Sequence, residues 1–289
     1  MNKGDSIKVY DGYVKLVDWM GDDNTPLVSA RMSTNNPTGV DVKKDDALRD
    51  RLLYDLHTSP FQGQQLVVEM ELPIFCLRQF ERHRTLSECD IEVVELDENW
   101  RKYHNRNEFS GRYSQMPDKY YIPELEDIHG QSTVNKQTGV DWFGQSMKEA
   151  VQDFIKNGIR GARSIYDNLV ENKVSNELSR VVLPSAQYTR VQYVADILNW
   201  AKCLALRVKP DVQPQTVKYA KTIEHIVEQV FPKTYLGLAD HIIYAEKISR
   251  SELDLIKDVI DIKRLRQLCI EGRIDERRAK RLFKKLGLE

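Results

Sequence analysis

The residues with the clearest chemical potential lie in one stretch of the chain, residues 79–113. It opens with Gln79 and the run Arg82-His83-Arg84, and it closes with Asn107-Glu108-Phe109-Ser110-Gly111-Arg112-Tyr113. A guanidinium offers a planar fork of donors that suits a phosphate or the edge of a pyrimidine, and glycine lets the main chain approach a ligand closely. The stretch therefore predicts a site for an anionic ligand that carries a ring. The alternative interpretation is a salt-bridged surface turn, since charged runs are usually solvated.

A helix is predicted to position the opening of this stretch. Pro73 suits a first helical position, and Ile74 and Leu77 follow at helical spacing. On that helix Gln79 and Arg82 are three residues apart, so we expect an amide and a guanidinium to face the same way. A strand over residues 65–72 precedes the helix, and a strand that delivers basic residues through a helix suits anion binding.

The two motifs together resemble the signature of the flavin-dependent thymidylate synthases. Arg-His-Arg followed by Asn-Glu-x-Ser-x-Arg-Tyr is long and chemically unusual, and the resemblance extends over about residues 13–244. It implies a mixed α/β fold with a central antiparallel sheet flanked by helices, assembled as a homotetramer whose sites are shared between subunits. It also implies FAD as cofactor, NADPH and methylenetetrahydrofolate as co-substrates, and methylation of dUMP to dTMP.

The resemblance assigns the nucleotide to donors from distant parts of the chain. Arg180, before Val-Val-Leu-Pro, matches the family's phosphate-holding arginine, although alone it would equally be a surface ion pair. Arg207 is expected against the pyrimidine ring, where its charge would favour the negative charge that develops there. The expected substrate contacts are Gln79, Arg82, Glu108, Phe109, Ser110, Gly111, Arg112, Arg180 and Arg207.

The same resemblance predicts the residues around the flavin. His57 matches a histidine at the face where folate or nicotinamide enters, and with Arg207 it is one of two expected catalytic residues. Without the resemblance, His57 is a capping or packing residue and Ser33 is equally a helix cap. The expected cofactor contacts are Ser33, Ser59, Arg82, His83, Arg84, Glu108, Asp196 and Lys202.

Two departures from the family pattern stand out. On the flavin helix, Leu198 replaces an arginine and cannot hydrogen-bond a flavin, so we expect the cofactor to be held differently or weakly. In addition, an insert over residues 88–106 separates the two motifs, acidic first and basic later. Loop closure costs only about 0.6 kcal/mol per doubling of length, so we expect the insert to project from the rim while Arg84 and Glu108 stay close.

Length and composition indicate an ordinary globular protein. The chain has 289 residues, of which 41% are hydrophobic and 30% charged, with a formal net charge of -1, enough for one large domain with an appendage. The four cysteines are far apart and lack metal-ligand spacing, which favours a reducing compartment. The start lacks a signal-peptide pattern and no apolar run is long enough to span a bilayer, so we expect no membrane association and a cytoplasmic protein.

Hydrophobic periodicity predicts the remaining organisation. A strand is expected over residues 13–20, and helices over 45–56, 142–156, 161–170, 176–183, 194–206 and 215–230. We expect a catalytic domain over 1–248 and a helical extension over 249–289, in two segments divided at Gly272. Ten basic residues against three acidic ones between Lys263 and Lys285 would suit nucleic acid or an acidic partner. We favour the alternative, an amphipathic appendage that packs on the body or on a neighbouring subunit.

Three functions are compatible with the sequence. The first is thymidylate synthesis, which we expect. The second is another modification of a pyrimidine nucleotide, such as hydroxymethylation of dUMP or methylation of UMP, and the insert and the changed flavin helix motivate it. The third is a degenerate synthase that binds nucleotides without catalysis and uses its basic tail for nucleic acid.

Overall fold

The computed structural model describes residues 1–32, 38–39, 41–83, 86, 106–133, 139–141, 143–274 and 276–288. The chain separates into two compact units, Met1–Tyr244 and Ala245–Glu289. Ser33, Arg84 and the insert up to residue 105 lie outside the described residues. The expectations for the insert, and for the distance between Arg84 and Glu108, therefore stay predictions.

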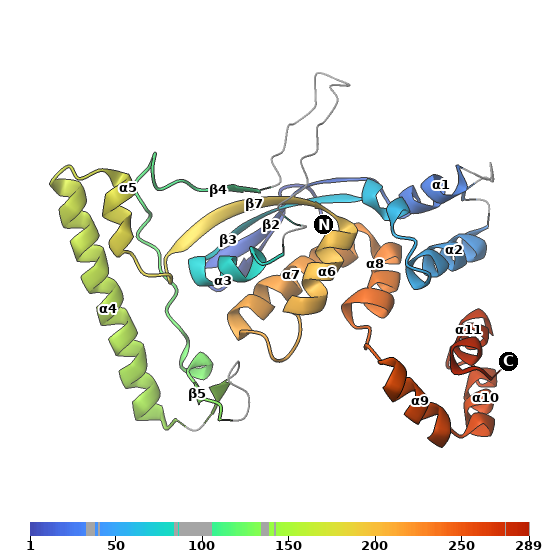
Figure 1. The fold of residues 1–289 in the computed structure, drawn as a ribbon. Helices are drawn as coiled ribbons and strands as arrows, with labels where there is room; N and C mark the ends of the chain where they lie inside the picture. Colours follow the sequence, from blue (N-terminus) through green and yellow to red (C-terminus); the bar gives the residue numbers. More distant parts are fainter. Residues whose placement is uncertain are drawn as a thin grey trace. The chain divides into compact units, whose positions relative to one another are not determined.

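An antiparallel sheet forms the centre of the first unit (Figure 1). Side chains along strand β2 (Gly12–Met20) alternate between the two faces of the sheet. Val14 and Leu16 are fully buried, whereas Tyr13 and Lys15, which alternate with them, are partly exposed. The sheet confirms the predicted mixed α/β fold and the two predicted strands. Its five strands, in spatial order, are β1 (Ser6–Val9), β2 (Gly12–Met20), β3 (Gln65–Pro73), β7 (Tyr188–Asp196) and β4 (Arg106–Glu108).

Three helices pack on one face of this sheet: α3 (Ile74–Phe80), α6 (Ile197–Arg207) and α7 (Pro214–Val230) (Figure 1). The main hydrophobic core lies between the helices and the sheet and includes Trp200 and Ile223, both fully buried. The predicted helix over 194–206 begins too early, because β7 continues to Asp196. The strand is buried on both faces near its end, so its apolar run merges with that of α6 and hides the boundary.

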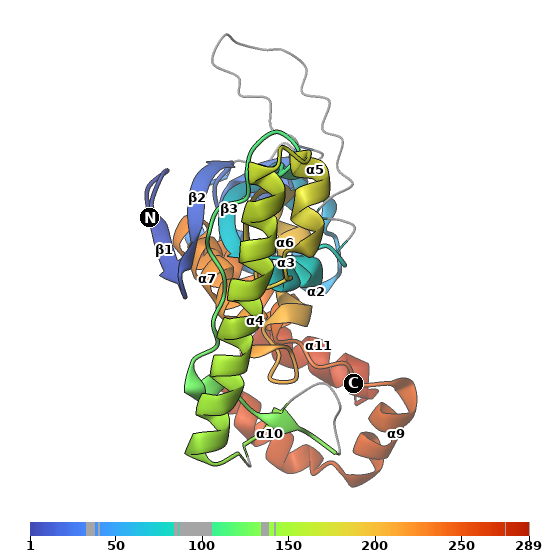
Figure 2. The same ribbon diagram turned by 90° about the vertical axis from the view of Figure 1, so that its left-hand side faces the viewer.

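The remaining elements surround this centre. The predicted helices over 142–156 and 161–170 are one helix, α4, because internal glycines cost only about 1 kcal/mol each and do not break a long helix. Helix α4 lies beside α5 (Figures 1 and 2). The other elements are α1 (Thr25–Arg31), α2 (Val42–Tyr54), η1 (Ser59–Gly63), η3 (Leu125–Asp127), β5 (Gly130–Gln131), β6 (Gly139–Val140), α4 (Gln145–Glu171), α5 (Asn176–Ser179), η4 (Arg180–Val182), α8 (Pro232–Leu238) and the π-helix η5 (Ala239–Ile243).

Helix α2 ends earlier than predicted. The sequence predicts Leu56 in its apolar stripe, but the helix stops at Tyr54 and Leu56 is exposed, with a φ of 56°. A left-handed residue closes a helix rather than extending it, so Leu56 belongs to the turn that leads to His57.

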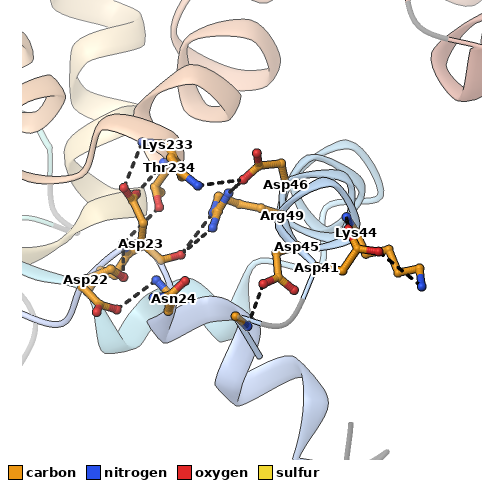
Figure 3. Close-up of polar contacts among 12 residues, drawn as sticks. Asp22, Asp23, Asn24, Asp41, Lys44, Asp45, Asp46, Arg49, Lys233 and Thr234 are labelled. Atoms are coloured by element: carbon orange, nitrogen blue, oxygen red, sulfur yellow. Dashed lines mark hydrogen bonds and ion pairs between the residues drawn. The ribbon is translucent and has the colours of Figure 1, made fainter. Parts of the chain in front are cut away.

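A polar network joins α2, α8 and the turn before α1 (Figure 3). The Asp23 carboxylate accepts hydrogen bonds from the main-chain nitrogens of Lys233 and Thr234, at 3.0 and 2.7 Å. Arg49 donates from Nε and Nη2 to the main-chain oxygen of Asp23, at 3.1 and 2.8 Å, and pairs with Asp46 at 2.8 Å. The two hydrogen bonds to the Asp23 carboxylate satisfy otherwise unpaired N–H groups at the start of α8, and Arg49 links the same turn to α2.

The second unit consists of α9 (Arg250–Val259), α10 (Ile262–Ile270) and α11 (Glu276–Leu286). Ser249 and Glu252 form a capping box at the start of α9, and Asp261 caps α10. The sequence predicts two segments here, but the cap at Asp261 divides the first into two helices. Among the helices of the described residues, none is both long and apolar enough to span a bilayer.

Candidate functional site

The end of α6 meets the end of α3. Arg207, the last residue of α6, donates from Nε to the main-chain oxygen of Gln79 at 3.0 Å. Its guanidinium is partly buried, and burial lowers the pKa of Arg207 below its usual value. No carboxylate of the described residues pairs with this guanidinium. Its positive charge is therefore available to an anionic group that binds beside it.

His83 lies next to that guanidinium. Burial and the positive charge of Arg207 together lower the pKa of His83 to about 4, so the ring is neutral at physiological pH. Its Nε2 is buried without a hydrogen-bond partner among the described residues. A buried polar atom without a partner costs free energy, which the polar edge of a ligand would recover.

The turn after α3 carries Arg82 and His83. The sequence predicts both on the helix, with Gln79 and Arg82 on a common face, but α3 ends at Phe80. The His83 N–H bonds the Phe80 oxygen at 3.0 Å and closes the turn, which leaves Arg82 exposed and Gln79 partly buried. The prediction that Arg82 and His83 lie on the helix is therefore wrong, and Pro73, expected as the first helical residue, is the last residue of β3.

Glu108 is held at the edge of the sheet, where β4 pairs with β7. Its Oε1 accepts a hydrogen bond from the Thr189 hydroxyl at 3.0 Å, and its Oε2 accepts one from Arg106 Nη2 at 2.7 Å. The same Arg106 nitrogen pairs with Glu81, directly after α3. This contact joins the closing half of the motif to the segment that carries its opening half.

The loop after β4 passes against Arg180. A Cβ at Gly111 would lie 2.6 Å from Met116 Sδ and 3.1 Å from Arg180 Cδ, so glycine lets this main chain lie close to both side chains. Glycine and arginine, 69 positions apart in the printed sequence, are therefore neighbours as the resemblance implies. The arrangement offers a main-chain segment beside a guanidinium, which suits a phosphate.

Other residues of the closing motif shape the same loop. The Phe109 N–H bonds the main-chain oxygen of Arg190 at 2.8 Å, which continues the pairing of β4 with β7. The Arg112 N–H donates to the Ser110 hydroxyl at 3.3 Å. The Arg112 side chain is about half exposed and pairs with Glu177 of α5 at 3.3 Å.

Two groups of predicted residues thus emerge. We call Gln79, His83 and Arg207 the ring cluster, and Gly111, Arg112 and Arg180 the anion cluster. Arg106 pairs with Glu81, which lies between Gln79 and His83 in the chain, and the chain continues from Arg106 to Gly111. No polar contact between members of the two clusters occurs within the described part of one chain.

The other predicted cofactor residues lie near the start of α6. His57 and Ser59 are exposed, and η1, which begins at Ser59, packs against α6. Asp196 caps α6: its carboxylate accepts from the main-chain and side-chain nitrogens of Asn199, at 2.9 and 2.7 Å, and burial raises its pKa. Lys202 is exposed on α6, whereas Leu198 is only 3% exposed and belongs to the core.

Sequence reasoning missed the contributions of β7 and of Arg106. Thr189 and Tyr193 lie on β7, for which no strand is predicted, although its β-branched and aromatic residues are the available signal. The sequence places Arg106 at the basic end of the insert, and nothing in its sequence neighbourhood indicates the two carboxylates that it contacts.

The chain is similar to known proteins in both sequence and fold. The family model "Thymidylate synthase complementing protein" matches residues 15–233. The flavin-dependent thymidylate synthase of Ehrlichia ruminantium (strain Gardel) is 32% identical over 254 residues, which cover 88% of this chain and 79% of that protein. The flavin-dependent thymidylate synthase of Thermus thermophilus is 32% identical over 256 residues, which cover 88% and 86%.

Solved structures support the fold. The UMP/dUMP methylase PolB of Streptomyces cacaoi bound with 5-Br dUMP has a TM-score of 0.65 and 22% identity, over 79% of this chain and 95% of that one. Because the family model spans most of the chain and the relatives align over nearly nine tenths of it, this protein belongs to the thymidylate synthase complementing protein family, that of the flavin-dependent thymidylate synthases.

Proposed function

We propose that this protein methylates dUMP to dTMP, with methylenetetrahydrofolate as carbon donor and with FAD that NADPH reduces. The observation that carries this proposal is the partly buried guanidinium of Arg207, which lies beside the neutral His83 and has no carboxylate partner among the described residues. A charge fixed in this way can stabilise negative charge on a pyrimidine ring, as the methylation of carbon 5 requires.

The residues of the ring cluster fit a flavin and a pyrimidine. Both rings carry nitrogen and carbonyl groups along their edges, which match the orphaned Nε2 of His83 and the guanidinium of Arg207. When bound, the flavin supplies the redox chemistry that no side chain provides. We propose that it is held by Arg82, His83, Arg84 and Glu108, with Ser33, Ser59, Asp196 and Lys202.

Arg207 has a defined task in this site. Placed at the uracil edge that bears the second carbonyl and the ring nitrogen, its guanidinium favours the enolate-like form of the ring. Electron density then rises at carbon 5, the ring atom that receives the methyl group. His83, neutral at physiological pH, offers a hydrogen bond without a competing charge. His57 is exposed and is proposed to line the face where folate or nicotinamide enters.

The anion cluster is proposed to bind the phosphate of dUMP. A nucleotide monophosphate carries nearly two negative charges, and Arg112, Arg180, the Ser110 hydroxyl and the Gly111 main chain are suitable donors. The ring and anion clusters make no polar contact within the described part of one chain. As the resemblance to the family implies, we propose a homotetramer in which neighbouring subunits share each site.

The cytoplasm is the proposed location. Cys76, Cys203 and Cys269 are free, which fits a reducing compartment. Burial raises the pKa of the Cys203 thiol to about 12, so this cysteine, although close to Arg207, is not a nucleophile at neutral pH.

A product assay tests the proposed function. The purified protein is incubated with FAD, NADPH, methylenetetrahydrofolate and either dUMP or UMP, and the nucleotides are identified by mass spectrometry. We expect bound flavin, consumption of NADPH and formation of dTMP. Protein that stays colourless with added FAD would exclude this function, and a hydroxymethylated or uridine-derived product would assign the chain to the related modifying enzymes.

A further inference from the structure

One nitrogen of Arg106 bridges two carboxylates from different elements. Its Nη2 pairs with Glu81, which directly precedes Arg82, and with Glu108 Oε2 at 2.7 Å. The side chains of all three residues are about one third exposed, at 31–33%. Partial burial makes such contacts stronger than those of solvated surface pairs, because water screens them less.

The position of Arg106 is fixed by the sheet. On β4 it lies opposite Tyr193 of β7, and Tyr193 packs edge-on against Trp200 with the ring centroids 6.2 Å apart. Arg106 Nε and the Tyr193 hydroxyl are both buried without partners among the described residues. Burial raises the pKa of Tyr193, so this hydroxyl stays neutral. The titratable and charged groups that face the bridge are therefore Glu81 from the turn after α3, Arg106 and Glu108 from β4, and Tyr193 from β7.

Removal of the guanidinium would leave two carboxylates converging on one point. Like charges at such a distance repel each other. Glu108 is also held by the Thr189 hydroxyl at 3.0 Å, whereas the turn at Glu81 depends on α3. Repulsion would thus move Glu81, and with it the turn that carries Arg82 and His83.

We propose that Arg106 is a positioning residue, which fixes the Glu108 carboxylate and the turn after α3 in their working arrangement. This inference rests on the proposed function for its effect on dUMP and FAD. Arg106 acts through Glu81 and Glu108 rather than on the reacting atoms.

The variant Arg106→Met tests the proposal, because it keeps an unbranched side chain and removes the charge. At about pH 8 we expect the Kd for FAD and the KM for dUMP to rise about tenfold, the scale of a coupled network. The double variant Glu81→Gln with Arg106→Met lacks the repulsion, and we expect it to recover most of the affinity for both ligands.

A matched control and a readout without ligands complete the test. Arg78→Met removes an exposed positive charge from α3 and should leave both constants unchanged. Hydrogen exchange in residues 74–83 should be faster in Arg106→Met and return to the wild-type rate in the double variant. If wild-type protein binds neither FAD nor dUMP, the proposed function fails while hydrogen exchange still tests the bridge. Hydrogen exchange at the wild-type rate in Arg106→Met, or a defect in binding that Glu81→Gln does not relieve, would overturn the proposal.

Discussion

Arg207 and Gln79 are 128 positions apart in the chain, yet Arg207 Nε and the Gln79 main-chain oxygen are 3.0 Å apart. This hydrogen bond fixes the orientation of the guanidinium relative to α3. Among the described residues, the Nη1 atom has a polar contact only with the main-chain oxygen of Leu206, at 3.4 Å, which is a long contact. The outer nitrogens of Arg207 are therefore the groups that a bound pyrimidine would meet.

Arg207→Ala should lower kcat for dTMP formation by about 100-fold or more, as expected when a donor to developing negative charge is removed. Arg207→Lys keeps the charge and loses the planar fork, so its kcat should lie between that of the wild type and that of Arg207→Ala. Lys209→Ala, two residues on and exposed, is the matched control and should keep the wild-type kcat. Rescue of a thymidine-requiring strain by Arg207→Ala would remove Arg207 from its assigned role.

Gly111→Ala should weaken the binding of dUMP. The added Cβ would lie 2.6 Å from Met116 Sδ and 3.1 Å from Arg180 Cδ, so the methionine must shift and the arginine must give way slightly. Because a small displacement of Arg180 would move its guanidinium away from the phosphate, we expect the KM for dUMP to rise about tenfold. A Cβ at Gly158 meets nothing within 4 Å, so Gly158→Ala should leave that KM unchanged. Equal KM values for the two variants would contradict the placement of Arg180 at the phosphate.

The sequence predicts the fold class better than the boundaries of the elements in this protein. The family resemblance singles out Arg207 and Gly111, and their roles in the site stay predictions. The predicted helix over 194–206 takes in the end of β7, because a strand buried on both faces loses the alternation by which strands are recognised. The end of α3 at Phe80 is missed because the pairing of Glu81 with Arg106 is a tertiary contact without a local signal.

Asp23→Ala should destabilise the fold without affecting catalysis. Its carboxylate accepts hydrogen bonds from Lys233 N and Thr234 N at the start of α8 (Figure 3), and loss of such a cap costs about 1–2 kcal/mol. Urea unfolding should show a lower free energy of unfolding, with kcat per folded molecule unchanged.

Lys44→Ala is the control for the network in Figure 3. Lys44 is 74% exposed and pairs with Asp41 at 3.3 Å, so its loss should change the free energy of unfolding by less than about 0.5 kcal/mol. Equal losses in the two variants would mean that the cap on α8 contributes nothing beyond an ordinary surface contact.

The low pKa of His83 predicts a stability that depends on pH. The pKa is about 4 in the folded chain against an ordinary value of 6.5, so between these values the unfolded chain binds a proton that the folded chain does not. The free energy of unfolding should therefore fall as pH is lowered through this window. In the variant His83→Gln, this decrease in the free energy of unfolding with falling pH should be absent. The variant His225→Gln, on the exposed side of α7, should retain the decrease. An NMR titration that gives His83 an ordinary pKa would refute the prediction.

The final prediction concerns the boundary between the two units. A chain that ends at Tyr244 should unfold cooperatively with nearly the free energy of unfolding of the full chain, because residues 1–244 form one compact unit. The Tyr244 hydroxyl donates to Glu224, a buried carboxylate that also accepts from the Tyr235 hydroxyl at 2.9 Å. Tyr244, the last residue of the first unit, thus contributes a hydrogen bond to a buried carboxylate of that unit.

A chain that ends at Leu238 is the matched comparison. It lacks η5, including Ile243, which is 3% exposed, and His241, whose Nε2 lies 2.7 Å from Asp50 Oδ1. Loss of a buried isoleucine alone costs about 2–5 kcal/mol, so this chain should fail to unfold cooperatively under conditions where the longer one does. Differential scanning calorimetry of both chains decides the point. If the chain that ends at Tyr244 also lacks a transition, residues 245–289 belong to the folding unit of the catalytic domain rather than to a separate extension.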